Sequence, residues 1–592
     1  MSEAVTSTMT CPKQTLRILL VICCMVSDGQ AVDVSTTLGP IRGFATTMDD
    51  GTVLNTFLGV PFAAPPTGNL RFSPPQPHQG WTDVYDATRF GPACLQYSLP
   101  GTTTPVTPYD PSLDDVNISE DCLNLNVYGP QVSGDDPLLP VMLYIHGGAH
   151  VTGANKLQDG SLLAQKGVIV VITNYRIGAL GFFSTGDSSA PGNYGLLDQL
   201  EAMKWVRANI QAFGGSPDRV TIFGESSGAA SSSLHLLSPL SRDYFYQAIL
   251  QSGASTSPWA VLLPEYEPQT YTEELARQMG CSTQSTQELV DCLREKTAEE
   301  ISSADVGKPP PMSAAAWAPV VDGPGGFLPA RPLDLLDQGQ FTKVRLMAGC
   351  TSDERSTDLV IIPGVENGVS RDRFIADLAD FVERYPRNRD FISDSLLHGY
   401  TDYDAINDPI TTRNNYVQFL SDYRYLAAEE EVLLRMSAGG VSTYKYSFGY
   451  QPIPDLFPTW QGVPHAAELR FLFNLTTQWF VGGAPTAADL DMREKMITMW
   501  TNFAKTGDPT PSPIDGVTWQ PFTNETRAYL MIDRPLTNGQ FLHTRRMELW
   551  NNVIRNMAET DTCESGAVAS NGNTASAAVA ILLMSSVLLV VT

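Results

Sequence analysis

Short apolar runs alternate with helical patterns from about residue 140 to about residue 260, and no linker interrupts them. Residues 141–145 and 219–223 have the length and apolar character of buried strands, and residues 344–349 form another such run. Residues 229–234 are small and then apolar, as in a helix that packs against a sheet. Strands that alternate with helices are typical of a parallel sheet. The pattern predicts one large α/β domain, with a mostly parallel central sheet and helices on both faces.

The amino end of the chain has the pattern of a secretory signal peptide. Lys13 and Arg17 precede an apolar run at residues 18–26, and the small residues Gly29 and Ala31 follow it. A basic stretch, an apolar stretch and small residues in this order are removed on secretion. We therefore predict a signal peptide over residues 1–31, an extracellular protein, and a folded domain over residues 32–555.

The carboxyl end has the pattern of a glycolipid (GPI) anchor signal. Residues 577–592 form an apolar tail with no Lys or Arg beyond it, and a small and polar linker, residues 556–576, precedes the tail. Small residues, a spacer and a terminal apolar tail direct the attachment of a GPI anchor. We predict attachment at Ser565, with Ser570 and Asn571 as alternatives, and a cell-surface location. A spanning tail anchor is the other interpretation, although the tail is short for one.

The composition narrows the range of partners. Of the 592 residues, 43% are hydrophobic, which is ample for a large core, and the formal net charge is −26. Such a charge repels a phosphate backbone, so we expect no nucleic-acid partner. An acidic surface is typical of a soluble extracellular protein, and it also attracts cations. We expect no metal and no cofactor.

Cysteine usage agrees with secretion, because thiols are oxidised outside the cell. Of nine cysteines, three fall within the predicted signal peptide. Short separations favour two local disulfides, each stabilising the fold by about 2–4 kcal/mol, and they are Cys94–Cys122 and Cys281–Cys292. Cys350 lies in an apolar strand and is predicted to be a buried free thiol. Cys563 is a candidate for bridging two chains of a homodimer.

Three sequons are compatible with N-glycosylation of a secreted protein, and they begin at Asn117, Asn474 and Asn524.

The most informative motif is Gly224-Glu225-Ser226-Ser227-Gly228. It follows the predicted strand 219–223 and precedes the predicted helix 229–234. Gly-x-Ser-x-Gly between a strand and a helix is the nucleophile elbow, in which a sharp, strained turn exposes the serine hydroxyl. The helix that begins there points N–H groups and its positive dipole end at the same place, which favours a developing oxyanion. We therefore predict Ser226 as a nucleophile.

A serine hydroxyl needs a base, and the base needs an acid that orients it. At a nucleophile elbow the order along the chain is serine, acid, histidine. The histidines far enough beyond Ser226 are His398, His465 and His543. We favour His465, because it lies in a loop with Pro and Gly that runs into a helix, and we expect the other two at the surface. The acid is expected after the strand 344–349, where Asp353 and Glu354 are both contenders.

An oxyanion hole needs two or three N–H groups about 3 Å from the reacting oxygen. The residue after the nucleophile, Ser227, supplies one. The others are expected from the glycine-rich loop at residues 146–150, which directly follows the predicted strand 141–145.

These pieces together resemble a type-B carboxylesterase of the cholinesterase–carboxylesterase family, in the α/β-hydrolase superfamily. The resemblance runs from about Val34 to about Trp550. Its most specific motifs are FLGVPFA at 57–63, LRF at 70–72, EDCLNLN at 120–126, NYR at 174–176, GNYGLLDQ at 192–199 and FGG at 213–215. The resemblance implies an α/β-hydrolase fold and, over residues 32–555, a catalytic domain.

The resemblance also implies roles for particular residues. The catalytic triad of the family falls on Ser226, Glu354 and His465, which favours Glu354 over Asp353. The oxyanion hole falls on the N–H groups of Gly148, Ala149 and Ser227, and the two short-range disulfides fall on the two pairs given above. Glu225 matches the acidic residue beside the nucleophile. Glu468 matches a carboxylate behind the histidine, where we expect it to pair with Ser252.

Departures from the family pattern bear on the substrate. Cholinesterases bind a quaternary ammonium on aromatic faces, but residues 94–122 contain no tryptophan, only Tyr97 and Tyr109. The aromatic pair expected after the triad acid is replaced by Thr357 and Asp358, and Asp358 is expected to replace it in part through its charge. Arg355 stands where the family usually has glycine, and the sequence offers no explanation. In the acyl pocket, Trp259 matches a family tryptophan, and small residues replace two phenylalanines, at Ser313 and Ala315.

The sequence thus predicts a serine esterase that forms an acyl-enzyme from neutral carboxylic esters with a fairly wide acyl pocket. One alternative is a cholinesterase of butyryl preference, which the acidic surface favours and the missing tryptophan disfavours. The other is a catalytically inactive adhesion protein like the neuroligins. That alternative is disfavoured because all three triad residues are present.

Overall fold

The structure is a computed structural model that describes residues 30–96, 117–134, 136–310, 313, 315–452, 457–474 and 485–560. Cys563, the predicted anchor residues Ser565, Ser570 and Asn571, and Tyr97 and Tyr109 lie outside these ranges. The first strand begins at Gln30, two residues before the start predicted for the domain, and the last helix ends at Glu559. Within the described ranges, no helix has the length and apolar character needed to cross a membrane.

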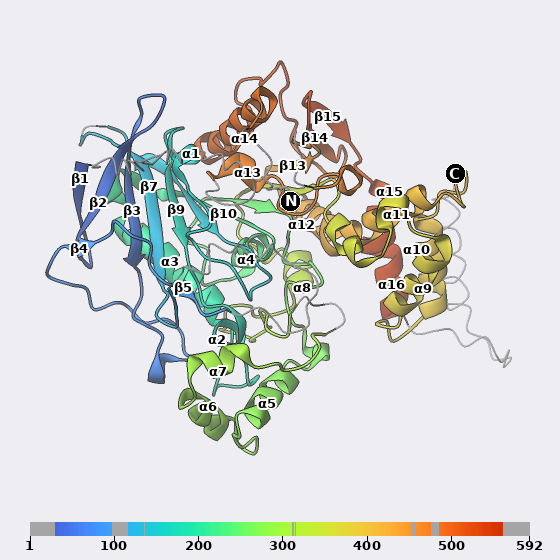
Figure 1. Cartoon of the computed structure of the whole chain (residues 1–592), viewed down its shortest axis with the longest axis horizontal. Coiled ribbons are helices and arrows are strands. Elements are labelled where there is room, and N and C mark those ends of the chain that lie inside the picture. Colours follow the sequence, from blue (N-terminus) through green and yellow to red (C-terminus); the bar gives the residue numbers. More distant parts are fainter. Residues whose placement is uncertain are drawn as a thin grey trace, which may run out of the picture.

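A large mixed sheet forms the centre of the molecule (Figure 1). In the described residues its strand order is β1-β2-β3-β7-β9-β8-β10-β11-β12-β13-β14-β15, with β4 beside β2. Pairing is parallel from β9 to β14 in this order, and antiparallel from β1 to β9 and between β14 and β15. The predicted mostly parallel sheet is therefore confirmed. The strands are β1 (Gln30–Thr36), β2 (Gly39–Thr47), β3 (Val53–Pro61), β4 (Tyr85–Asp86), β7 (Asn124–Pro130), β8 (Leu139–Ile145), β9 (Ile169–Thr173), β10 (Gly215–Glu225), β11 (Gln247–Gln251), β12 (Arg345–Thr351), β13 (Thr443–Phe448), β14 (Ala528–Ile532) and β15 (Thr537–Gln540). A separate pair joins β5 (Ala93–Cys94) to β6 (Ile118–Ser119).

Helices lie on both faces of the sheet and also form two peripheral groups. One group comprises α5, α6 and α7, and the other comprises α9, α10, α11 and α16, on the side of the molecule away from β1 and β2 (Figure 1). The helices are α1 (Ser161–Ala164), α2 (Gly178–Phe182), α3 (Tyr194–Asn209), α4 (Ser227–Leu237), α5 (Gln269–Gln278), α6 (Thr286–Arg294), α7 (Ala298–Ser303), α8 (Pro332–Asp337), α9 (Arg371–Val382), α10 (Arg389–Gly399), α11 (Pro409–Ser421), α12 (Ala427–Ala438), α13 (Leu469–Leu472), α14 (Ala487–Thr506), α15 (Thr544–Glu548) and α16 (Arg555–Glu559).

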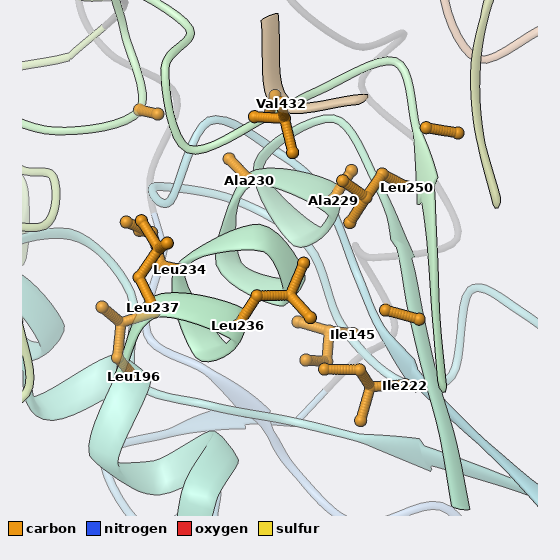
Figure 2. Close-up of a cluster of buried hydrophobic side chains, with 14 of the residues drawn as sticks. Ile145, Leu196, Ile222, Ala229, Ala230, Leu234, Leu236, Leu237, Leu250 and Val432 are labelled. Carbon is orange, nitrogen blue, oxygen red and sulfur yellow. The ribbon is translucent and has the colours of Figure 1, made fainter. Parts of the chain in front are cut away.

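The central strands are apolar on both faces, because each face packs against helices. In β8, Val141, Leu143 and Ile145 belong to one buried cluster, and Met142 and Tyr144 belong to the other. Successive side chains of a strand point to opposite faces, so this alternation divides the core into two layers. Figure 2 shows the first layer, where the apolar side chains of α4 lie close to strand residues, among them Ile145, Ile222 and Leu250.

Two disulfides join the cysteines that the sequence pairs. Cys94–Cys122 links β5 to the segment before β7, and Cys281–Cys292 links the end of α5 to α6. Cys350 is the buried free thiol of the described residues, as predicted. Its Sγ lies 2.8 Å from Oε2 of Glu429, a carboxyl whose burial raises its pKa to about 7.

Candidate active site

The turn from β10 to α4 holds Ser226 in a backbone conformation that L-residues rarely adopt, with φ 56° and ψ −124°. Such a conformation costs on the order of 1–3 kcal/mol and persists only where the surroundings impose it. The two glycines of the motif allow this turn to pack closely. A Cβ on Gly228 would lie 2.0 Å from the carbonyl oxygen of Ile145, and one on Gly224 would lie 2.5 Å from the backbone of Gly228.

Hydrogen bonds on both sides fix the backbone of Ser226. Its N–H donates to the carbonyl of Gln251 (2.8 Å), and its carbonyl accepts from the N–H of Ala230 (3.0 Å). The residue is 9% exposed. In the described part of the chain, no hydrogen bond engages its hydroxyl, so this oxygen is available to a reactant.

The loop after β8 lies directly against the elbow. A Cβ on Gly147 would lie 3.1 Å from Cβ of Ser226, and the N–H of His150 donates to Oγ of Ser227 (3.2 Å). Gly148 and Ala149 both have positive φ, 111° and 55°, so the chain turns sharply here. Within the described ranges, the N–H groups of Gly148, Ala149 and Ser227 donate no hydrogen bond. They are therefore available to donate to an oxyanion, as an oxyanion hole requires.

Glu354 and His465 form a buried carboxylate–imidazole pair. Nδ1 of His465 lies 2.5 Å from Oε2 of Glu354, and the N–H of His465 donates to the carbonyl of Glu354 (3.1 Å). The other carboxylate oxygen accepts from the hydroxyl of Ser252 (2.5 Å) and the N–H of Thr351 (2.8 Å). Burial opposes the ionised form, but His465 and these hydrogen bonds outweigh it and lower the pKa of Glu354. The carboxylate is therefore charged at neutral pH.

The neighbouring carboxyl, Asp353, has a different position. Its Oδ2 accepts from the hydroxyl of Ser352 (2.6 Å) and from the N–H of Val463 (3.1 Å). Asp353 thus holds the loop that carries His465, whereas Glu354 contacts the imidazole itself. The two carboxyls are adjacent after the same strand but make different contacts. For this reason the sequence pattern by itself could not decide between them as the acid.

The second imidazole nitrogen contacts Glu225. Nε2 of His465 lies 3.0 Å from Oε1 of Glu225, and no described hydrogen bond joins His465 to Ser226. Burial raises the pKa of Glu225 to about 8, and nearby Glu468 and Glu354 act in the same direction. Burial alone would lower the pKa of His465, but Tyr425, Glu225 and Glu354 outweigh it and raise that pKa. The lowered pKa of Glu354 makes its carboxylate a charge that stabilises an imidazolium here.

One predicted pairing is wrong. Ser252 donates its hydroxyl to Glu354, not to Glu468. Glu468 instead accepts from the amide of Gln251 (3.2 Å), whose own oxygen accepts from the indole N–H of Trp500 (3.2 Å). The reason is register, because Ser252 follows β11 at the edge of the sheet where Thr351 ends the neighbouring strand β12, and both residues donate to Oε1 of Glu354.

An aromatic side chain that the sequence analysis missed packs on the imidazole. The ring of Tyr425 lies 4.8 Å from that of His465 and 5.6 Å from that of Trp259. Tyr425 belongs to a π-helical turn, Asp422–Leu426, between α11 and α12. A π-helical turn inside a longer helix is often found at functional sites, but no local sequence pattern predicts this one.

Of the three residues predicted for an acyl pocket, Trp259 is linked to the candidate site through Tyr425. Trp259 is buried, and its indole N–H donates to the carbonyl of Arg424 (3.0 Å). The rings of Trp259 and His465 both contact the ring of Tyr425. Ser313 is half-buried and donates its hydroxyl to the carbonyl of Ala315, which is buried. In the described part of the chain, no hydrogen bond joins these two residues to Trp259.

The two other histidines are exposed, as predicted. Nδ1 of His398 lies 3.2 Å from the hydroxyl of Tyr403 near the end of α10, and His543 precedes α15.

Parallel strands that deliver the serine, the acid and the histidine in this chain order place the protein among the α/β-hydrolases. The family described as "Carboxylesterase family" matches residues 30–550, and the chain belongs to that family. Mouse (Mus musculus) neuroligin-3 is 34% identical, over 91% of this chain and 71% of its own length. The acetylcholinesterase of Bungarus fasciatus is 35% identical, over 93% of this chain and 91% of its own. Because a neuroligin and an acetylcholinesterase are about equally identical to this chain, membership of the family does not by itself establish that the chain is catalytically active.

Proposed function

We propose that this chain is a serine carboxylic-ester hydrolase. The observation that carries the proposal is the Glu354–His465 pair beside a strained elbow serine whose hydroxyl is available. Three unengaged N–H groups, those of Gly148, Ala149 and Ser227, surround the same turn. A protein without hydrolytic function has no need to pair a buried imidazole with a carboxylate, hold a nucleophile strained and leave amide donors unengaged at one place.

In the proposed reaction, His465 takes the proton of Ser226 as its oxygen attacks the ester carbonyl. The oxyanion is stabilised by the amides of Gly148, Ala149 and Ser227, which are already oriented. His465 then protonates the departing alcohol, and water hydrolyses the acyl-enzyme by the same route. Glu354 holds the tautomer with a proton on Nδ1 and stabilises the imidazolium. For Nε2 to reach Ser226, it must exchange its contact with Glu225.

The proposed substrates are neutral carboxylic esters, and a fairly wide acyl pocket is proposed to admit acyl groups larger than acetyl. The support is the small side chains at positions 313 and 315 and the absence of tryptophan from residues 94–122. Choline esters are the second candidate, favoured by the likeness to an acetylcholinesterase and by the net charge of −26. The ratio of kcat/KM for butyrylthiocholine to that for an uncharged isostere separates the two, and a ratio near one rules out choline selectivity.

We further propose that the protein is secreted, glycosylated and held at the cell surface by a GPI anchor. The support is the sequence at both ends, together with the exposed side chains of the three sequon asparagines, Asn117, Asn474 and Asn524. Release of the protein from intact cells by a phosphatidylinositol-specific phospholipase C tests the anchor. Reducing and non-reducing gels of wild type and Cys563→Ser test a disulfide-linked dimer.

The decisive experiment compares Ser226→Ala with a matched control on p-nitrophenyl butyrate. The control is Ser232→Ala, which removes another buried hydroxyl of α4, one bonded to the carbonyl of Gly228 (2.9 Å). We expect Ser226→Ala to lose at least about a thousandfold in kcat/KM and the control to stay within a few-fold. A wild-type protein with no turnover and no labelling by a fluorophosphonate would instead support an inactive, neuroligin-like protein.

A further inference from the structure

Arg355, which the sequence left unexplained, is engaged at the edge of the candidate active site. It directly follows Glu354, and its backbone N–H donates to Oγ of Ser421 (3.1 Å). Its guanidinium forms a two-point ion pair with Asp358, in which Nε lies 2.7 Å from Oδ2 and Nη2 contacts the other oxygen. The two side chains are only 14% and 23% exposed. A planar guanidinium on a carboxylate is the geometry in which arginine pairs most strongly.

The same guanidinium is linked to the catalytic imidazole through one aromatic ring. Nη1 of Arg355 donates to the hydroxyl of Tyr425 (3.3 Å), and the Tyr425 ring packs on His465 at 4.8 Å. One side chain, Tyr425, therefore separates the charge of Arg355 from the imidazole, and Asp358 lies one contact farther out. In a partly buried site, a unit charge at such a range acts strongly on a charged substrate.

We propose that Arg355 determines specificity by neutralising Asp358 and so keeps the site selective for esters of uncharged alcohols. The inference rests on the proposed esterase function. Asp358 alone would present a negative charge at the edge of the candidate site and attract a cationic alcohol group, as its charge led us to expect from the sequence. Paired with Arg355, it presents a dipole with no net charge. The site then has neither a free carboxylate nor the aromatic pair of a cholinesterase at this position.

The proposal predicts effects of opposite sign for the two partners. Arg355→Gln leaves Asp358 unpaired, so the preference for a cationic ester rises. Asp358→Asn leaves Arg355 unpaired, so the preference falls. At a range of roughly 10 Å and an effective dielectric constant near 20, each change amounts to about tenfold. The double variant restores neutrality and returns the preference to the wild-type value.

The test measures kcat/KM for butyrylthiocholine and for its carbon isostere, S-(3,3-dimethylbutyl) thiobutyrate, with wild type and the three variants. The ratio of the two values cancels losses that affect both esters equally, such as a shift of Tyr425. The matched control is Arg42→Gln, which breaks a two-point pair with Asp33 (2.7 Å for each contact) on β1 and β2. In the strand order these two strands lie seven and eight positions from β12, about 35 Å at the usual strand spacing and several times a Debye length.

Opposite shifts in the two single variants, with the ratio unchanged in Arg42→Gln, support the proposal. A ratio that stays within twofold of wild type in both single variants overturns it, and so does an equal shift in the control. If Arg355→Gln does not fold, Asp358→Asn decides, because a fall of about tenfold supports the proposal and an unchanged ratio overturns it. Failure of the esterase assignment is distinct, because the wild-type protein would then hydrolyse neither ester.

Discussion

Replacing Glu354 by glutamine removes one charge from the candidate active site while keeping the shape of the side chain. The amide oxygen can still accept from Ser252 and Thr351, which bond to Oε1 in the structure. The amide nitrogen then faces Nδ1 of His465, where the carboxylate lies at 2.5 Å. Because an amide N–H donates, Nδ1 must accept, and the ring proton moves to Nε2. That tautomer cannot take a proton from Ser226.

The magnitude follows from the lost attraction between the carboxylate and the imidazolium. Two unit charges about 4 Å apart interact by about 4 kcal/mol at an effective dielectric constant of 20. A barrier raised by that amount slows the reaction about a thousandfold. We therefore expect kcat/KM for p-nitrophenyl butyrate to fall by about three orders of magnitude. The acidic limb of the pH profile should move to lower pH, since Glu354 raises the pKa of His465.

The control is Asp353→Asn, one residue earlier. Its amide oxygen can still accept from the N–H of Val463, as the carboxylate does at 3.1 Å. It has no described contact with the imidazole, so we expect a loss below about tenfold. The reasoning is refuted if Glu354→Gln keeps more than a tenth of wild-type activity, or if Asp353→Asn loses as much as Glu354→Gln.

Three further predictions concern packing, pH and acyl selectivity. Gly228→Ala should lower the melting temperature sharply or prevent folding, because its Cβ would lie 2.0 Å from the carbonyl oxygen of Ile145. The control is Gly134→Ala, whose Cβ would have no neighbour within 4 Å, and its melting temperature should equal that of wild type. Burial lowers the pKa of three histidines, to about 4 for His146 and to about 3 for His150 and His235. Because these histidines titrate near 6.5 in the unfolded chain, the unfolded chain binds protons first as the pH falls. The folded state therefore loses stability below about pH 6.5, by about 2–3 kcal/mol per histidine at pH 4.5. Buried carboxyls with raised pKa values oppose this trend, so the test compares wild type with His235→Gln. Urea unfolding at pH 7 and pH 4.5 should show a smaller loss of unfolding free energy in His235→Gln than in wild type, and equal losses would contradict the prediction. Ala315→Phe should raise the acetate-to-butyrate ratio of kcat/KM about tenfold with p-nitrophenyl esters, and an unchanged ratio would place this residue outside the acyl pocket.

Local sequence predicted the elements that carry the site. Runs at residues 141–145, 219–223 and 344–349 correspond to β8, β10 and β12, and the predicted helix at 229–234 to α4. These predictions succeeded because strand, turn and helix are consecutive in the chain, and the glycines mark where the backbone must approach closely. The sequence pattern did not predict the antiparallel strands β1, β2 and β3, since their order depends on pairing between distant segments.

Contacts between distant segments limited the prediction of the site itself. Asp353 and Glu354 follow the same strand, and only the direction of each side chain separates their tasks. The partner of Ser252 was predicted wrongly, because the register between β11 and β12 decides it. Tyr425 and the engagement of Arg355 depend on a helical segment about 70 residues beyond β12, at residues 422–426, and no pattern near Glu354 points there.

The three amide donors at the elbow belong to the main chain, and this sets how the protein can change over generations. No ordinary substitution except proline deletes a backbone N–H. The proposed chemistry can therefore be lost at a single codon, for the serine, the glutamate or the histidine, while the amide donors stay in place. The three amide donors would remain after that event, so a single reversion would bring back every group of the proposed site.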